Sequence, residues 1–204
     1  MTGPEMIVVR TGTANLASVL AALVRLGVRA RASNDATDIE RAERLILPGV
    51  GAFGTAMDRL QADRLIEPLR RRIVAGRPTL AICLGMQLLF DGSQESPGQA
   101  GIGIVPSTLQ RFTGDVRVPQ MGWNRLMADD ACRILQSGYA YFANSYRATQ
   151  TLPGWSVATA DHGGPFLAAI ERGAVVACQF HPELSGAFGL GLIRRWLSLE
   201  VDAC

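Results

Sequence analysis

Short apolar runs alternate with amphipathic stretches along the first part of the chain. The run MIVVR (6–10) is rich in β-branched residues and is followed by the turn signal TGTAN, which is typical of a buried strand that meets a loop. Apolar residues then recur at helical spacing between a cap at Thr13 or Asn15 and a stop at Gly27. The recurring residues are Leu16, Val19, Leu20, Leu23 and Leu26. The pattern predicts a strand followed by a helix.

The same alternation continues up to residue 83. VRARAS (28–33), RLILPG (44–49) and TLAIC (79–83) predict strands, and a helical segment is expected over 55–74. Strands that alternate with helices need crossover connections, so the fold class is α/β, with an open, mostly parallel central sheet and helices on both faces. Sheets of this kind bind ligands beyond the carboxyl ends of their strands.

After residue 91 the pattern changes. DGSQESPGQAGIG (91–103) predicts a surface loop, and short strand-like pieces follow it. These pieces are VRVPQ, YAYFANSY, WSVATA, FLAAI and AVVACQF. They predict a small antiparallel extension of the same sheet. A closing amphipathic helix is expected from Leu190, Ile193, Trp196 and Leu197. Because no internal repeat or long linker separates the elements, one domain over 1–204 is expected.

Composition narrows the class of protein. Hydrophobic residues make up 48%, charged residues 19%, and the formal net charge is +2, which is typical of packed α/β proteins. The cluster Arg70–Arg72 is expected to be a solvated helix face rather than a nucleic-acid patch. The sequence shows neither a secretory start nor an apolar stretch of membrane length, so a cytoplasmic location is expected. The four cysteines have no CxxC spacing, which indicates free thiols, and neither a metal nor a cofactor is expected.

Cys83 stands between the predicted strand TLAIC and the helix start LGMQLLF. Strand, sharp turn, nucleophile and helix form a nucleophile elbow, which needs small neighbours such as Ala81 and Gly85. The helix N-terminus would stabilise a thiolate, and the N–H of Leu84 would face an oxyanion formed on an attacked carbonyl group. An inert buried cysteine is the alternative for this stretch taken alone.

A cysteine nucleophile usually requires a base, and the chain has two histidines. His162 lies in the turn DHGGP and is expected at the surface. His181 follows the apolar run AVVACQF, at the same kind of strand end as Cys83. Pro182 forces an extended conformation on His181, so that Glu183 can reach a ring nitrogen and fix its tautomer. The result is a candidate triad of Cys83, His181 and Glu183; the alternative is a strand-to-helix turn whose Glu183 favours the next helix N-terminus.

A third motif, LPGVGAFG (47–54), follows another predicted strand. Its glycines allow unusual backbone angles, and a loop of this kind can present N–H groups to a ligand. Glycine loops after strands are also common in purely structural positions. Because no Gly-Lys-Ser/Thr follows, the motif is not a phosphate loop.

Together and in this order, the motifs resemble those of the class I (triad) glutamine amidotransferases. The resemblance runs along nearly the whole chain, and its motifs are LPGVGAFG, ICLGMQLLF, GIGIVP, PQMGWN, YFANSY and QFHPELS. PQMGWN (119–124) is the most specific of them. It resembles the branch of the family that serves imidazole glycerol phosphate synthase in histidine biosynthesis. The resemblance implies a single glutamine amidotransferase domain over 1–204.

The resemblance also implies roles for individual residues. A triad of Cys83, His181 and Glu183 would hydrolyse glutamine to glutamate and ammonia through a glutamyl thioester. The oxyanion donors would come from Leu84 and from the loop of Gly49, Val50 and Gly51. Glutamine would be bound by Gln87, Glu95, Ser145 and Tyr146. The implied partner is a (β/α)₈-barrel cyclase subunit, which would use the ammonia and form a heterodimer with Trp123 and Asn124 near the interface.

Two places depart from the family pattern. Residues 10–15 read RTGTAN where Asp-Tyr-Gly-x-Gly-Asn is usual, and Asn144 stands where a His is usual before Ser-Tyr. Because Asn cannot titrate near neutral pH, any signalling that depends on that His would be altered. Two other interpretations stay open. The chain could be the glutaminase subunit of another synthase, such as the anthranilate synthase type, or a regulatory module of the same fold without glutaminase chemistry.

Overall fold

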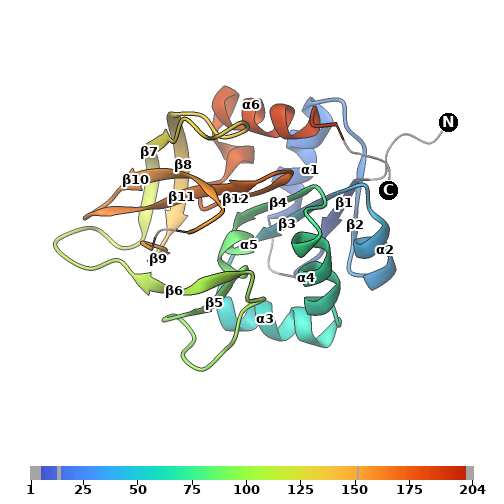
Figure 1. The fold of residues 1–204 in the computed structure, drawn as a ribbon, viewed down its shortest axis with the longest axis horizontal. Coiled ribbons are helices and arrows are strands. Elements are labelled where there is room, and N and C mark those ends of the chain that lie inside the picture. The colour runs from blue at the N-terminus through green and yellow to red at the C-terminus, as the bar shows by residue number, and fades with distance from the viewer. Residues whose placement is uncertain (1–5, 13–14, 151, 201–204) are drawn as a thin grey trace.

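The computed structural model describes residues 6–12, 15–150 and 152–200 (Figure 1). Within these residues, parallel strands form one half of a nine-stranded sheet: β2 (Ala30–Ser33), β1 (Met6–Val9), β3 (Arg44–Gly49), β4 (Thr79–Cys83) and β12 (Val175–Cys178), in that spatial order. Antiparallel strands continue it with β11 (Pro165–Arg172), β10 (Ser156–Asp161), β7 (Gln120–Ala128) and β8 (Gly138–Asn144). The predicted α/β fold, a largely parallel sheet with an antiparallel extension, is confirmed.

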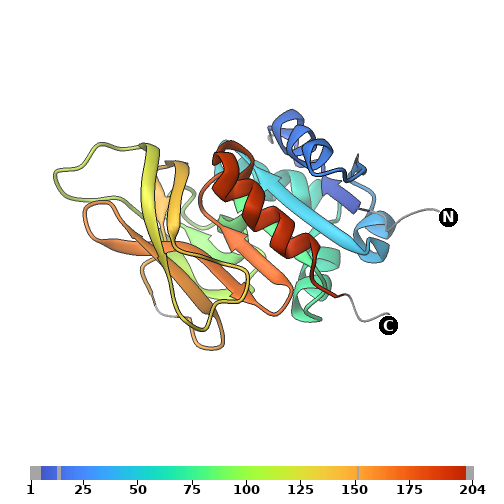
Figure 2. The same cartoon turned by 90° about the horizontal axis from the view of Figure 1, so that it is seen from above.

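Helices cover both faces of this sheet, as predicted. One face carries α2 (Ala36–Arg41), α3 (Phe53–Ala62) and α4 (Ile66–Val74), and the other carries α1 (Leu16–Arg25) and α6 (Gly186–Leu197). Figure 2, seen from above, shows α6 in red lying over one face of the sheet, roughly along the neighbouring strands. No helix in the described part of the chain is long and apolar enough to cross a membrane.

The two apolar cores follow from the alternation of side chains along each strand. In β1, Ile7 packs with α3 and α4, whereas Val8 packs with α1 and α6. Val175 and Val176 of β12 divide between the same two cores. Because the central strands are buried on both faces, they read in the sequence as continuous apolar runs, which is typical of parallel sheets.

The predicted ends of α1 are confirmed where the structure describes them. Asn15 Oδ1 accepts a hydrogen bond from the N–H of Ser18 at 3.4 Å, and Gly27 has φ +75° just after the helix. Thr13, the alternative cap, lies outside the described residues. α2 was not predicted from the sequence, although Asp35 caps it by accepting hydrogen bonds from the N–H groups of Thr37 and Asp38.

The prediction of one helical segment over 55–74 was wrong. The chain forms α3 and α4 with a break between them, where Arg64 has φ +56°. No glycine or proline marks this break in the sequence. Pro68 lies near the start of α4, where its missing N–H costs nothing because the first N–H groups of a helix have no intrahelical partner.

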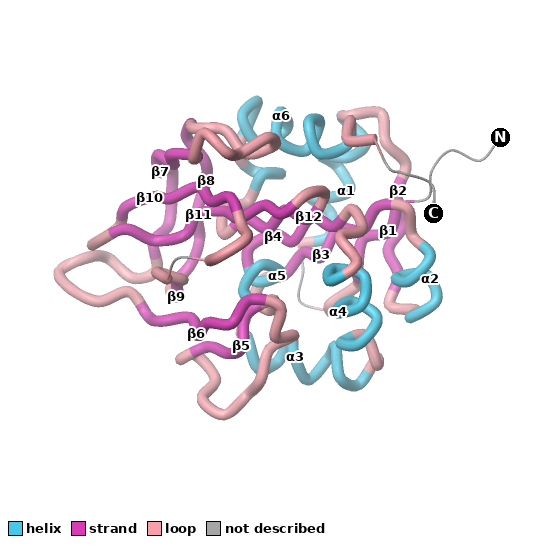
Figure 3. Tube along the Cα trace, in the orientation of Figure 1, coloured by secondary structure: helices cyan, strands magenta, loops and turns pink. Residues whose placement is uncertain are grey.

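The region after residue 91 also differs from the prediction. A small three-stranded sheet joins β5 (Phe90–Ser93), β6 (Val105–Arg111) and β9 (Tyr146–Arg147), so the predicted loop is shorter than expected. Figure 3 shows the loops that connect β5 to β6 and β6 to β7. VRVPQ contributes only its last residue, Gln120, to β7.

The expectation that the Arg70–Arg72 cluster is solvated was wrong for Arg72, which is only 2% exposed. Its guanidinium donates hydrogen bonds to the carbonyl oxygens of Ile39, Ala42, Glu43 and Pro78. Burial lowers the pKa of Arg72 to about 9. Arg72 therefore ties α4 to α2, to the segment between α2 and β3, and to the residue before β4.

Candidate functional site

Cys83 ends β4 in a conformation that side chains rarely adopt, with φ +53° and ψ −111°. α5 (Leu84–Gln87) starts at the next residue, so the strand-turn-helix geometry predicted around Cys83 is present. Gly85 approaches the backbone of β3 so closely that no Cβ atom fits there. The turn therefore holds the Cys83 side chain at the carboxyl end of the sheet, where it is 6% exposed.

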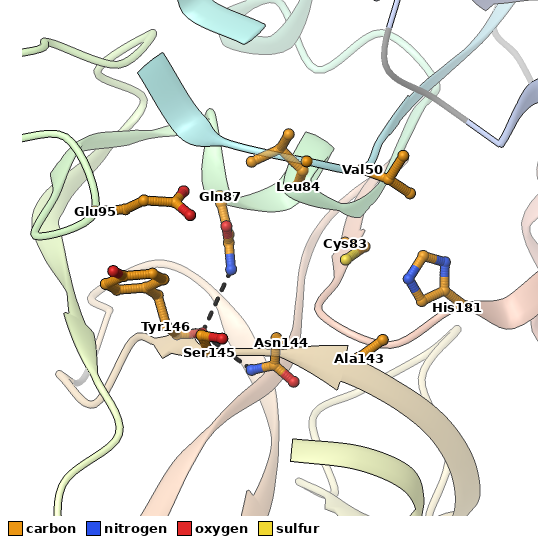
Figure 4. Close-up of a pocket in the computed structure, with 11 residues that line it drawn as sticks. Val50, Cys83, Leu84, Gln87, Glu95, Ala143, Asn144, Ser145, Tyr146 and His181 are labelled. Carbon is orange, nitrogen blue, oxygen red and sulfur yellow. Dashed lines mark hydrogen bonds between the residues drawn. The ribbon is translucent and has the colours of Figure 1, made fainter. Parts of the chain in front are cut away.

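His181 follows β12 at the same edge. Its N–H donates to the carbonyl oxygen of Tyr141 at 2.9 Å, and the one-turn helix η1 (Pro182–Leu184) begins directly after it. Nδ1 of His181 lies 2.8 Å from Oε1 of Glu183, and both side chains are buried. Because Nδ1 faces the carboxylate, Nε2 is the ring atom left for the sulfur, and the ring and sulfur are neighbours in Figure 4.

The charge state of His181 follows from these contacts. Burial by itself lowers the pKa of the imidazole. Hydrogen bonds to Cys83 and Glu183, together with the electrostatic interactions with both groups, outweigh burial and raise the pKa of His181 to about 10. At neutral pH the ring is therefore an imidazolium between a sulfur and a carboxylate, which is an arrangement that supports a thiolate nucleophile.

A cavity of about 210 Å³ opens at this edge of the sheet (Figure 4). Its lining consists of Val50, Gly51, Cys83, Leu84, Gln87, Glu95, Ala143, Asn144, Ser145, Tyr146 and His181. Most of the residues predicted for the site therefore come together around one cavity. Gly49 does not line it but pairs with Cys83 in the β3–β4 register, and Glu183 lies behind His181.

Glu95 lines the other end of the cavity, and Ser96 follows it in the loop after β5. Glu95 Oε2 accepts a hydrogen bond from the N–H of Phe53 at 2.7 Å, and Ser96 Oγ accepts one from the N–H of Gly54 at 3.0 Å. These N–H groups belong to the first turn of α3, whose cap residue Ala52 has no polar side chain. The loop therefore caps α3 and keeps the Glu95 carboxylate beside the cavity.

Comparisons with known proteins agree with this geometry. Residues 8–195 match the family described as glutamine amidotransferase class-I. The chain belongs to this family. It is 42% identical to imidazole glycerol phosphate synthase subunit HisH of Streptococcus gordonii, with 94% of each chain covered. It is 41% identical to imidazole glycerol phosphate synthase hisHF, chloroplastic, of Arabidopsis thaliana, covering 94% of this chain and 34% of that one.

Solved structures share the fold of this glutamine amidotransferase. One, titled as a crystal structure of glutamine amidotransferase, matches with a TM-score of 0.75 at 23% identity, covering 94% of this chain and 96% of that one. Another, the structure of PurLQS from Thermotoga maritima, matches with a TM-score of 0.72 at 16% identity, covering 96% and 98%. At these identities the likeness concerns the fold alone.

Some residues at or beside the cavity were not predicted from the sequence as site residues. Ala143 and Asn144 line the cavity, and the Asn144 Nδ2 donates to the carbonyl oxygen of Tyr146 at 3.0 Å. Gln179 lies beside the sulfur, with its Nε2 at 3.8 Å from Cys83 Sγ. In the sequence, Gln179 stands out only as a single amide in an otherwise apolar run. The sequence does not show that this amide lies beside Cys83.

Cys132, Cys178 and His162 are not among the residues that line the cavity. His162 is half-buried, with Nε2 at 2.8 Å from the carbonyl oxygen of Arg117 and its ring edge-on to Phe112. Burial raises the pKa of the Cys178 thiol well above its usual range and that of the Cys132 thiol to about 11. Both thiols are therefore poor nucleophiles. Cys204 lies outside the described residues.

Strands β7 and β8 of this amidotransferase present apolar side chains to solvent. Met121, Trp123, Met127 and Tyr139 are between 48% and 66% exposed. Trp123 packs edge-on against Tyr141, with ring centroids 6.4 Å apart. Asn124, the next residue of β7, instead donates its Nδ2 to the carbonyl oxygen of Asp161 at 2.8 Å. Met121 pairs in register with Ala143, which lines the cavity, so the apolar face reaches the edge of the site.

Proposed function

We propose that this chain is the glutaminase subunit of an imidazole glycerol phosphate synthase in histidine biosynthesis, with one glutamine amidotransferase domain over 1–204. It hydrolyses glutamine to glutamate and ammonia and passes the ammonia to a separate cyclase subunit. The observation that carries the proposal is the meeting of the Cys83 sulfur with the His181–Glu183 pair at the edge of the cavity. The HisH relatives, about 40% identical over nearly their whole length, support the choice of pathway.

The first half of the proposed reaction uses the thiolate of Cys83. Its sulfur attacks the side-chain amide carbon of glutamine, and the carbonyl oxygen becomes an oxyanion. The His181 imidazolium then gives its proton to the departing nitrogen, the C–N bond breaks, and ammonia leaves a glutamyl thioester on Cys83. Glu183 holds the ring in the orientation that both proton transfers need.

The second half consumes a water molecule. Neutral His181 takes a proton from water, and the resulting hydroxide attacks the thioester carbon. The C–S bond breaks, glutamate leaves, and the thiolate–imidazolium pair is restored. Each turnover therefore converts one glutamine and one water to glutamate and ammonia, with no cofactor.

We assign the oxyanion donors to the N–H of Leu84 and to an amide of the loop formed by Gly49, Val50 and Gly51. Leu84, Val50 and Gly51 line the cavity beside Cys83, which supports the assignment. The loss of one such donor typically lowers the rate by about 10²-fold or more. Gln87, Glu95, Ser145 and Tyr146 line the same cavity, and we assign them to the bound glutamine, with the Glu95 carboxylate facing its α-ammonium group.

The proposed partner is a (β/α)₈-barrel cyclase subunit, bound as a heterodimer on the exposed face of β7 and β8. The supporting observation is that Trp123 and its apolar neighbours form a surface that borders the cavity. Asn124 would hold the edge of this surface through its hydrogen bond to Asp161. A cytoplasmic location fits this pathway and is part of the proposal.

The proposal is tested by reconstitution with the cyclase subunit of the same organism. Glutamate release is expected to be slow for the chain alone and to rise strongly when the cyclase and its nucleotide substrate are added. The Cys83→Ala variant should be inactive under both conditions. High activity without a partner would contradict the proposed coupling, and no activity with it would contradict the function.

Two alternatives give different results. Activation by the synthase subunit of an anthranilate synthase, instead of the cyclase, would identify the other synthase type, against which PQMGWN argues. A regulatory module without glutaminase chemistry would leave Cys83 unreactive toward a glutamine-like electrophile. Alkylation of Cys83 that glutamine blocks would exclude the regulatory module.

A further inference from the structure

Gln179 is a fully buried carboxamide beside the candidate nucleophile. It follows β12 directly, its side chain is 1% exposed, and its N–H donates to the carbonyl oxygen of Ala168 at 2.8 Å. Gln179 is not among the residues that line the cavity. Buried polar side chains are retained where their hydrogen bonds are satisfied, so the partners of Gln179 indicate what it does.

Both ends of the Gln179 carboxamide face residues of the site. Its Oε1 accepts a hydrogen bond from Gln87 Nε2 at 2.9 Å, and its Nε2 donates to Cys83 Sγ at 3.8 Å. Gln87 Nε2 also donates to the carbonyl oxygen of Tyr146 at 3.4 Å. A chain of hydrogen bonds therefore runs from the Tyr146 backbone through the two carboxamides to the sulfur. Figure 4 shows its first link, from Gln87 to Tyr146.

The direction of this chain is set by a backbone atom. A peptide carbonyl group can only accept, so Gln87 must turn its NH₂ group toward Tyr146. The second hydrogen of that NH₂ group meets Gln179, which must then present its oxygen. The NH₂ group of Gln179 is left to face Cys83, so the sulfur meets a donor. If Gln179 were flipped, two NH₂ groups would oppose each other.

We propose that Gln179 is a positioning residue, which holds the Cys83 sulfur with an N–H···S hydrogen bond and couples it to the substrate contact Gln87. This inference rests on the proposed glutaminase function and deepens it. A hydrogen bond to an anion is stronger than one to a neutral group, so the contact favours the thiolate over the thiol and over the thioester. It therefore stabilises the attacking sulfur in the first half-reaction and the leaving sulfur in the second.

A matched pair of variants separates the two contacts of Gln179. Gln179→Glu keeps the shape and an oxygen for Gln87, but an ionised carboxylate cannot donate to sulfur and repels a thiolate. Gln179→Met keeps a similar volume and removes both contacts. Gln110→Glu, at an exposed position of β6, controls for the added negative charge.

The first measurement is alkylation of Cys83 by iodoacetamide across a range of pH, with Cys83→Ala giving the background from the other cysteines. In Gln179→Glu the rate at neutral pH is expected to fall by about 10- to 100-fold, as for loss of a hydrogen bond to a charged group, and the profile to move to higher pH. Gln110→Glu should match the parent chain. This measurement needs no turnover, so it tests Gln179 even if the proposed function fails.

The second measurement is glutamine hydrolysis by the complex with the cyclase. Gln179→Glu should lower kcat by about 10- to 100-fold and keep KM within about threefold, whereas Gln179→Met should also raise KM because Gln87 loses its partner. An unchanged alkylation profile in Gln179→Glu, or a change in KM alone, would overturn the proposal. If both variants failed to fold, Gln179 would be a structural residue and the proposal would likewise be overturned.

Discussion

Gly85 lies so close to Leu47 that a Cβ atom on Gly85 would stand 1.9 Å from the Leu47 carbonyl oxygen. The first turn of α5 thus rests directly on the backbone of β3. Leu84 lies between Cys83 and Gly85, so the same contact limits how far the Leu84 backbone can shift. A residue with no side chain is therefore required for the shape of the turn, whatever the chemistry of its neighbours.

Gly85→Ala is expected to lower the free energy of unfolding by about 2–3 kcal/mol, because either the turn or β3 must shift to admit the methyl group. Glutaminase activity should fall with it. Gly92→Ala is the control, since a Cβ there would meet its nearest atom, the Gln99 carbonyl oxygen, at 3.4 Å. Urea unfolding curves of Gly85→Ala and Gly92→Ala measure the difference. Coinciding curves would contradict the prediction.

Cys83→Gly should unfold less readily than Cys83→Ala, although neither variant can form a thioester. The reason is the backbone of residue 83, whose φ of +53° and ψ of −111° strain any residue with a Cβ. Glycine relieves this strain but gains freedom in the unfolded chain, so a net difference of about 1 kcal/mol is expected. Thermal or urea unfolding measures it, and equal stabilities would show that the turn carries no strain.

The His181 imidazole should stay protonated through neutral pH and titrate near 10, because Cys83 and Glu183 raise its pKa. The chain has two histidines, so NMR of the His162→Gln variant follows His181 alone. In Glu183→Gln the pKa should fall. A midpoint near the ordinary value of 6.5 in the unmodified triad would contradict this prediction.

The same shift has a consequence for stability. Because the folded-state pKa of His181 lies above its ordinary value of 6.5, proton binding favours the folded chain. This contribution is fully present below pH 6.5 and is lost as the pH rises to about 10. Between pH 6.5 and about 10, the free energy of unfolding should therefore fall more in the parent chain than in His181→Gln. Unfolding curves measured at several pH values test this.

Glu95→Gln is expected to raise KM for glutamine by about 10- to 100-fold with a smaller effect on kcat, because the amide lacks the charge that faces an ammonium group. Its oxygen can still accept the hydrogen bond from Phe53, so α3 keeps its cap. Steady-state kinetics of the reconstituted complex provides the measurement. Glu95→Ala adds loss of the cap and should also lower the melting temperature.

Trp123→Ala should weaken binding of the cyclase subunit by about 30-fold or more, as expected when a large exposed aromatic side chain at the centre of an interface is truncated. Val74→Ala is the control, since Val74 is 67% exposed on α4, a helix that lies away from β7 and β8 in Figure 1. Calorimetric titration with the cyclase compares them. If the two variants bound the cyclase with equal affinity, the proposal that the interface lies on β7 and β8 would be contradicted.

Much of the fold could be predicted because the sequence marks it locally. Arg44–Gly49 and Thr79–Cys83 were predicted with the bounds that the structure has, since both are buried on two faces and end at sharp turns. The break at Arg64 could not be predicted, because no glycine or proline accompanies its positive φ. The burial of Arg72 depends on carbonyl groups about 30 residues away, which periodicity along one helix does not reveal.

Some residues of the candidate site could likewise be predicted from the sequence, and others could not. Cys83 and His181 could be predicted because each stands at the end of an apolar strand, and parallel strands bring such ends to one edge of a sheet. Gln179 could not be predicted, because its role depends on a contact with Cys83, which is 96 positions away in the sequence. Asn144 was noted only as a departure from a family pattern, and its hydrogen bond to Tyr146 emerges from the folded strand.

The hydrogen bond between Glu95 and Phe53 joins the two ends of the cavity mechanically. Phe53 starts α3 two positions beyond Gly51, the last residue of the glycine loop that faces the sulfur. A ligand whose cationic end competes for the Glu95 carboxylate would therefore pull on the backbone that anchors this loop. Together with the neighbouring hydrogen bond between Ser96 and Gly54, this contact links binding at the Glu95 end of the cavity to the position of the loop amides beside Cys83.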